Sequence, residues 1–118
     1  MNKRIRVGVV GHGYFGSFHA KHYAANPDVE FVAIVDPRDL GLGKERLQLR
    51  DHRELIGKVD AVSIAAPTAR HYAIAADLIG AGIHVLVEKP LAPNAAEARD
   101  LTALAERAGV VLHVGHIE

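Results

Sequence analysis

The chain has 118 residues, of which 49% are hydrophobic and 24% charged, and its formal net charge is zero. This length and composition are typical of one globular domain. The balanced charge argues against nucleic acid or an anionic membrane as a partner. The absence of cysteine excludes disulfides, thiolate metal ligands and cysteine nucleophiles. No apolar run reaches the length of a membrane span or a signal-peptide core, so we expect a cytoplasmic protein.

Apolar runs alternate with helical patterns along the chain. The first run, IRVGVV, is short and rich in valine, as in a strand buried on both faces of a parallel sheet. In chain order, strands are predicted over Ile5–Val10, Glu30–Asp36, Leu47–Leu49, Val59–Pro67, Ile83–Pro90 and Val110–Gly115. Helices are predicted over Gly16–Asn26, Ala69–Ala81 and Ala95–Ala108. Residues 38–57 are expected to add a short or irregular helix and a helical turn over Asp51–Ile56.

Local signals mark several helix ends. Asn94, followed three residues later by Glu97, forms a capping-box pattern before the third helix. Gly109 is expected to end that helix, and Gly82 the second one. Thr68 is a candidate N-cap for the second helix.

Strands that alternate with crossover helices predict an α/β fold with a doubly wound parallel sheet. In such a fold the ligand crevice lies at the carboxyl ends of the strands, where the strand order reverses. The candidate residues that follow all come directly after a predicted strand.

The first candidate is a glycine pattern between the first strand and the first helix. Gly11 would permit the tight turn, Gly13 would let a pyrophosphate approach the backbone, and Gly16 would let the helix pack closely on the strand. The free N–H groups of the helix start would then bind phosphates. The same glycines would also serve a simple strand-to-helix turn, so the pattern does not decide the function by itself.

The second candidate is Asp36, at the end of the second strand and 20 residues after Gly16. A carboxylate there is placed to accept hydrogen bonds from the hydroxyls of an adenosine ribose. It would repel a 2′-phosphate and so favours NAD over NADP. Arg38 leaves NADP possible, because its guanidinium could pair with that phosphate.

Two further segments follow later strands. AAPTARH, residues 65–71, would lie beside the cofactor crevice, and His71 in it could face either the ligand or solvent. The sequence Glu88-Lys89-Pro90 places an adjacent acid and base at the mouth of an apolar strand. A lysine there could bind a substrate oxygen or, with a lowered pKa, move a proton. A surface ion pair that opens a turn is the alternative for Glu88 and Lys89.

The eight histidines do not predict a metal site. His19 and His22 share a helix face, and His113 and His116 lie near the end of the last strand, but neither pair has a carboxylate at a recognisable ligand spacing. We expect His19 to pack under the first strand and His22 to be solvated. His116 could instead face a nicotinamide.

Taken together, these motifs resemble the N-terminal domain of the Gfo/Idh/MocA oxidoreductases over essentially the whole chain. The resemblance runs from VGVVGHGYFGSFHA through VAIVDP and AAPTARH to VLHVGH, and its most specific part is the block from Gly82 to Ala92. It implies a Rossmann-type domain that binds NAD, or possibly NADP, within a dehydrogenase of sugars, polyols or nucleotide sugars. The ending GHIE resembles members that act on nucleotide-linked amino sugars.

The resemblance also implies roles for individual residues. The pyrophosphate would lie on the glycine loop and helix start, the ribose on Asp36, and the nicotinamide ribose near Glu88. Lys89 matches the family's catalytic or substrate-orienting lysine. The cofactor-binding residues so implied are Gly11, Gly13, Tyr14, Phe15, Gly16, Asp36, Arg38, Ala66, Pro67, Thr68, His71, Glu88 and Lys89.

The family's second domain has no counterpart in residues 1–118. That domain normally carries most substrate contacts, an acid/base histidine or aspartate, and the oligomer interface. We therefore expect these residues to bind cofactor with little turnover, and the full-length protein to be a homo-oligomer.

Two other hypotheses are open. The first is a non-enzymatic NAD-sensing regulatory domain, which has no reason to carry Glu-Lys-Pro. The second is an S-adenosylmethionine-binding domain, but the glycine spacing and the Glu-Lys-Pro segment argue against it.

Overall fold

The structure is a computed structural model that describes residues 4–11, 14–38, 41, 47–88, 92 and 94–115, with the backbone alone for residues 14–19. Its sheet has six parallel strands in the order β3-β2-β1-β4-β5-β6, which confirms the predicted doubly wound fold. The strands are β1 Ile5–Val10, β2 Val29–Val35, β3 Leu47–Leu49, β4 Ala61–Ile64, β5 His84–Glu88 and β6 Leu112–Gly115. The helices are α1 Tyr14–Ala25, α2 His71–Gly80 and α3 Ala95–Ala108, with short 3₁₀ turns η1 His52–Leu55 and η2 Thr68–Arg70.

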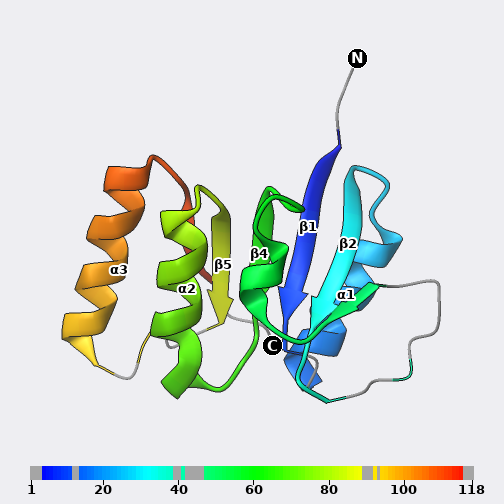
Figure 1. Ribbon diagram of the computed structural model, residues 1–118, viewed down its shortest axis with the longest axis horizontal. Coiled ribbons are helices and arrows are strands. Elements are labelled where there is room, and N and C mark those ends of the chain that lie inside the picture. The colour runs from blue at the N-terminus through cyan, green and yellow to red at the C-terminus, as the bar shows by residue number, and fades with distance from the viewer. Residues whose placement is uncertain are drawn as a thin grey trace.

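The helices cover the two faces of the sheet unequally. Figure 1 shows α2 and α3 in front of the sheet and α1 behind it. The main core lies between the sheet and α2 and α3, where Leu78, Ile79 and Leu101 are fully buried beside strand residues such as Ile64. On the other face, Tyr23 of α1 shares a short hydrogen bond with the buried hydroxyl of Ser63 in β4. Residues 7–10 of β1 are all buried between these two layers of helices, as the valine-rich sequence predicts.

The ends of α3 follow the sequence signals. The Asn94 side chain accepts a hydrogen bond from the Glu97 N–H at 2.9 Å, which satisfies one of the free donors at the helix start. Gly109 ends the helix in the left-handed conformation with φ of 70°. The predicted N-cap at Asn94 and the predicted helix end at Gly109 are therefore confirmed.

The prediction for Thr68 as the N-cap of α2 is wrong. Pro67 precedes η2, and the Pro67 carbonyl accepts a hydrogen bond from the Arg70 N–H at 2.8 Å. Thr68 is the first residue of that turn. The chain passes directly from η2 into α2 at His71, and no side chain caps either element. A continuous change of pitch from 3₁₀ to α takes the place of a cap.

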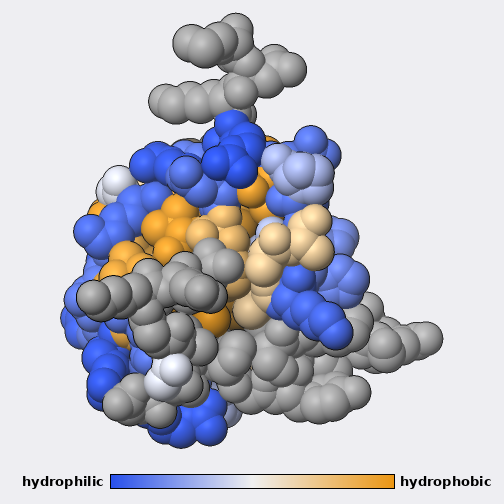
Figure 2. Space-filling model, turned by 90° about the vertical axis from the view of Figure 1, so that its right-hand side faces the viewer, coloured by the Kyte–Doolittle hydropathy of each residue, from blue (hydrophilic) through white to orange (hydrophobic). Residues whose placement is uncertain are grey.

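The short strand β3 forms one edge of the sheet, and among the described residues it pairs with positions 33–35 of β2 alone. Leu47 in β3 and Ile56 after η1 are exposed. Figure 2, which looks at this side, shows apolar residues surrounded by hydrophilic ones.

None of the helices in the described part of the chain has the length and apolar content needed to span a bilayer.

Candidate functional site

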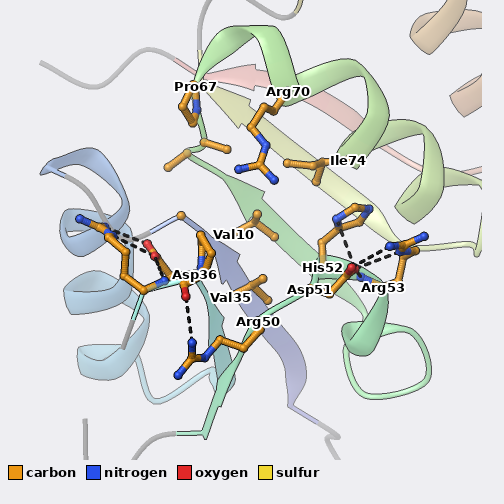
Figure 3. Close-up of a pocket in the computed structure, with 15 residues that line it drawn as sticks. Val10, Val35, Asp36, Arg50, Asp51, His52, Arg53, Pro67, Arg70 and Ile74 are labelled. Carbon is orange, nitrogen blue, oxygen red and sulfur yellow. Dashed lines mark hydrogen bonds and ion pairs between the residues drawn. The ribbon is translucent and has the colours of Figure 1, made fainter. Parts of the chain in front are cut away.

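A cavity of about 620 Å³ opens at the carboxyl ends of β1, β2 and β4. This is where the strand order reverses, because the chain leaves β1 toward β2 and β3 and later returns to place β4 on the other side of β1. Its walls come from the ends of β1 and β2, the turn after β2, residues 50–53, residues 65–67 and two side chains of η2 and α2. Figure 3 shows these segments converging from different parts of the chain.

Gly11 forms the floor of the cavity directly after β1. Its φ is +92°, and its N–H donates to the Val35 carbonyl at 2.7 Å. A Cβ at this position would lie 2.9 Å from the backbone carbon and oxygen of Ala65. Both the backbone conformation and the space therefore require glycine, which lets the loop after β1 lie against the loop after β4.

Asp36 lies at the end of β2 and is only 3% exposed. Its Oδ1 accepts from the backbone N–H and the Nε of Arg38, both at 2.9 Å, and its Oδ2 accepts from Nη2 at 2.8 Å. This bond with Asp36 raises the pKa of Arg38, which stays charged. The Arg38 side chain itself is 64% exposed. The two residues that were candidates for the ribose end thus form one bidentate pair on the cavity wall.

The segment after β3 holds this pair in place. The Gln48 side-chain amide donates to the carbonyl oxygens of Asp36, at 3.0 Å, and of Arg38. Arg50 Nη1 donates to the Pro37 carbonyl at 2.9 Å. The turn after β2 is therefore fixed by side chains from β3 and the residue that follows it.

Asp51, His52 and Arg53 form the far rim of the cavity. Asp51 caps η1, accepting from the Arg53 N–H at 2.8 Å, and its two oxygens pair with the Arg53 guanidinium at 3.0 and 2.7 Å. His52 Nε2 lies 2.7 Å from Asp77 Oδ2, which ties η1 to α2. The guanidinium of Arg53, followed by its backbone N–H, holds the pKa of Asp51 well below its usual range.

Arg53→Gln should raise the pKa of Asp51, because it removes the charged donors and keeps only the backbone N–H. A carboxyl whose pKa is lower in the folded protein adds stability above its unfolded value, near 3.8, and that stability is lost as the pH falls through the folded value. The wild-type protein should therefore be more stable than the variant at about pH 6, and the difference should shrink below about pH 4. Carboxyl-carbon NMR titration and urea unfolding measure the two effects. An unchanged Asp51 pKa in the variant would show that the Arg53 guanidinium is not what lowers it.

The loop after β4 supplies the opposite wall through Ala66 and Pro67. His71 does not line the cavity: it is 1% exposed, and its Nε2 lies 2.7 Å from the Ala66 carbonyl oxygen. Of the two orientations left open by the sequence, ligand or solvent, the structure shows neither, because His71 supports the loop from within. Thr68 lies next to Pro67 but is not part of the cavity wall.

The comparisons with known proteins place the chain in a family. Residues 5–116 match the model of the oxidoreductase family Gfo/Idh/MocA, described as an NAD-binding Rossmann fold. The chain belongs to this family. It is 36% identical to UDP-N-acetylglucosamine 3-dehydrogenase from Acidithiobacillus ferrooxidans over 97% of this chain and 37% of that protein. It is 34% identical to myo-inositol 2-dehydrogenase from Thermotoga maritima, over 94% of this chain and 36% of that protein.

Solved structures agree with this assignment to the Gfo/Idh/MocA family. The structure of GenD2 from gentamicin A biosynthesis, solved in complex with NAD, has a TM-score of 0.87 and 38% sequence identity, over 96% of this chain and 34% of that one. The chain thus spans a little over a third of the length of the relatives it matches. The predicted family, Rossmann-type fold and NAD-binding class are confirmed.

The cavity of this Gfo/Idh/MocA domain fits a dinucleotide. A glycine-only floor lies after β1, a buried carboxylate lies at the end of β2, and an apolar side chain, Ile74 of α2, lines the same cavity. Of the predicted cofactor-binding residues, the structure brings five to the cavity: Gly11, Asp36, Arg38, Ala66 and Pro67.

The other predicted residues of the family motif lie elsewhere or are not described. Glu88 ends β5 and does not line the cavity. Tyr14, Phe15 and Gly16 lie at the start of α1, with only their backbone described. Gly13, Lys89 and His116 lie outside the described residues.

Of the two predictions for histidines of α1, the structure tests one. His22 is exposed, as expected, and the side chain of His19 is not described. Within the described ranges, no group of three possible metal ligands is present.

Sequence reasoning missed the arginine-rich walls of the cavity. Arg50 and Arg53 follow β3, and Arg70 in η2 points its guanidinium into the cavity from the opposite side (Figure 3). One signal was available: residues 50–53 come directly after a predicted strand, as the other candidates do. The position of Arg70 depends on the 3₁₀ turn, which the helical pattern over residues 69–81 does not distinguish from α-helix.

Proposed function

We propose that the protein binds NAD in the cavity at the β1–β4 switch point. As part of a complete enzyme, it would transfer hydride between NAD and a hydroxyl or ketone of a sugar, polyol or nucleotide sugar. The observation that carries the proposal is the buried carboxylate of Asp36 beside the Gly11 floor, in a family with an NAD-binding Rossmann fold. The relatives named as sugar and inositol dehydrogenases support an enzyme rather than a regulatory sensor.

In this proposal each wall of the cavity has a task. The backbone at Gly11, the Gly13 and Gly16 positions and the start of α1 at Tyr14 and Phe15 hold the pyrophosphate through N–H groups. Asp36 accepts hydrogen bonds from the adenosine ribose.

Ala66 and Pro67 cover the opposite side of the cofactor, and His71 orients them by its contact with the Ala66 carbonyl. Thr68, next to Pro67, would lie near the same edge of the cofactor.

The chemistry is proposed for the residues after β5. When bound, the nicotinamide ring supplies the carbon that takes up or returns the hydride. Glu88 would approach the nicotinamide ribose, and Lys89, which follows it in the sequence, would polarise the substrate oxygen or move its proton. A substrate domain elsewhere in the full-length protein would supply the other acid/base group.

The same proposal extends to the full-length protein and its substrate class. Because relatives are about three times as long as the matched region, we propose that residues 1–118 are the cofactor domain of a longer, homo-oligomeric, cytoplasmic enzyme. We expect little turnover from these residues by themselves, and a steady dehydrogenase rate from them would contradict the need for a substrate domain. The nucleotide-sugar class is supported by the similarity to UDP-N-acetylglucosamine 3-dehydrogenase.

Isothermal titration calorimetry tests the binding proposal. The purified protein is titrated with NAD and, in a parallel experiment, with S-adenosylmethionine, which shares the adenosine but lacks the pyrophosphate. We expect saturable binding of one NAD per chain and no comparable binding of S-adenosylmethionine. Absence of NAD binding by a folded protein, or a preference for S-adenosylmethionine, would refute the proposal.

A further inference from the structure

Four arginines among the described residues line the cavity, and three of them are engaged by other groups of the protein. Arg38 and Arg53 each pair with an aspartate two residues earlier in the chain. The Arg50 guanidinium donates to the Pro37 carbonyl at 2.9 Å. The guanidinium of Arg70 has no hydrogen bond or ion pair within the described part of the chain, and it points into the cavity (Figure 3). Its partner is therefore to be sought in the ligand.

The position of Arg70 is fixed by the turn that carries it. Its backbone N–H donates to the Pro67 carbonyl at 2.8 Å, which forms η2 directly before α2 begins. Ile74 comes four residues later and lines the same cavity, as expected for side chains one helical turn apart. A guanidinium and an apolar side chain therefore lie together on the wall formed by η2 and α2 (Figure 3).

This wall borders the part of the cavity that is left for the base of a bound dinucleotide. In the proposed function, backbone N–H groups at the glycine loop and the start of α1 hold the pyrophosphate, and Asp36 holds the ribose. The base attached to that ribose then has the remaining space, which the apolar side chains of Val35, Pro37 and Ile74 line. Arg70 is thus beside an apolar space that suits a flat base, whereas the phosphates have other donors.

We propose that Arg70 holds the adenine of the cofactor by stacking its guanidinium on one face of the base, beside Ile74. A guanidinium is planar and weakly hydrated, and it stacks well on aromatic faces. Because the Arg70 side chain is exposed, its outer face stays in water while its inner face covers the ligand. This role deepens the proposed function, on which it rests, and gives Arg70 a part in adenine recognition.

Substitutions that separate planarity from charge test this role by calorimetry with NAD and 5′-ADP. Arg70→Ala removes the flat face, so both ligands should bind about tenfold more weakly. Arg70→Tyr keeps a flat face without the charge and should stay within about threefold of the wild type. Arg70→Lys keeps the charge without the plane and should behave like Arg70→Ala. An ion pair with the pyrophosphate would reverse the order, with Arg70→Lys near the wild type and Arg70→Tyr weak.

Fluorescence reports the contact with the base directly. The chain has no tryptophan, so Arg70→Trp introduces a single indole at this position. Saturating 5′-ADP, which carries the adenine but no nicotinamide, should quench its emission through stacking of the two rings. Arg99→Trp, at an exposed position of α3 outside the cavity wall, is the matched control and should keep its emission unchanged. Arg99→Ala likewise should leave both affinities at the wild-type values.

The outcomes separate the role of Arg70 from the proposed function. If the wild-type protein binds NAD and Arg70→Ala binds it equally well, the adenine contact is overturned and the proposed function stands. The same holds if Arg70→Lys retains affinity while Arg70→Tyr loses it, if 5′-ADP does not bind, or if bound 5′-ADP leaves the Arg70→Trp emission unchanged. If a wild-type protein with a native circular dichroism spectrum binds neither NAD nor 5′-ADP, the proposed function fails and the adenine contact fails with it.

Discussion

Gly11→Ala is expected to abolish measurable NAD binding and to lower the free energy of unfolding by about 2–5 kcal/mol. Two costs add at this position. An alanine at φ of +92° is strained by about 1–2 kcal/mol. In addition, its Cβ would lie 2.9 Å from backbone atoms of Ala65, and backbone cannot move aside as a flexible side chain can. The loops after β1 and β4 would separate, and the cavity between them would lose its floor.

Gly82→Ala is the matched control for this substitution. Gly82 has a similar φ of +82°, but nothing lies within 4 Å of a Cβ built there, and it follows the C-terminal end of α2, outside the cavity wall. This variant should show only the strain of about 1–2 kcal/mol and keep its NAD affinity. Urea unfolding and calorimetry measure both quantities. Equal losses of stability in the two variants would show that the close approach to Ala65 costs nothing.

Asp36→Ala is expected to weaken NAD binding by about 10- to 100-fold, because the ribose hydroxyls lose a charged acceptor. The fold should survive. The partner that loses its carboxylate, Arg38, is largely exposed and can be solvated, so no charge is left buried. NADP should be less affected than NAD, since the phosphate would gain an Arg38 side chain released from Asp36. Titration calorimetry with both dinucleotides measures this difference.

The protein contains a close match to this pair at the other end of the sheet. The Asp60 carboxylate accepts from the backbone N–H, Nε and Nη2 of Arg6 at 2.9, 3.3 and 3.0 Å, the same three donors that Arg38 offers Asp36. Asp60 precedes β4 and does not line the cavity. Asp60→Ala should therefore leave NAD affinity unchanged. A similar loss of affinity in both variants would mean that Asp36 acts through the fold and not through the ribose.

The two aspartate–arginine pairs differ in how their residues come together. Asp36 and Arg38 are two residues apart, whereas Asp60 and Arg6 are 54 apart and meet only because β1 and β4 are neighbours. Asp36 follows an apolar strand, whereas Asp60 precedes one. Only the strand direction determines which one lies at the carboxyl edge, where the cavity is.

The sequence alone determined the sheet and most of its helices. Valine-rich runs such as IRVGVV specify buried parallel strands, because both faces of such a strand must be apolar. Asn94 specifies the start of α3 through its hydrogen bond to a backbone N–H, and Gly109 specifies the end through its left-handed conformation. The 20-residue separation of Gly16 and Asp36 predicts a ribose-binding carboxylate beside the glycine turn, since one βαβ unit brings the ends of its two strands together.

Only the tertiary structure decided what surrounds that site. Arg50, Arg53 and Arg70 reach the cavity because β3 lies beside β2 and because η2 turns the chain before α2. His71 is buried against the Ala66 carbonyl, although its position in the sequence suits a ligand contact equally well. The physical reason is the same in each case. Periodicity and caps report the environment of neighbouring residues along the chain, whereas side-chain partners across a crevice depend on strand order and on the exact turn that delivers them.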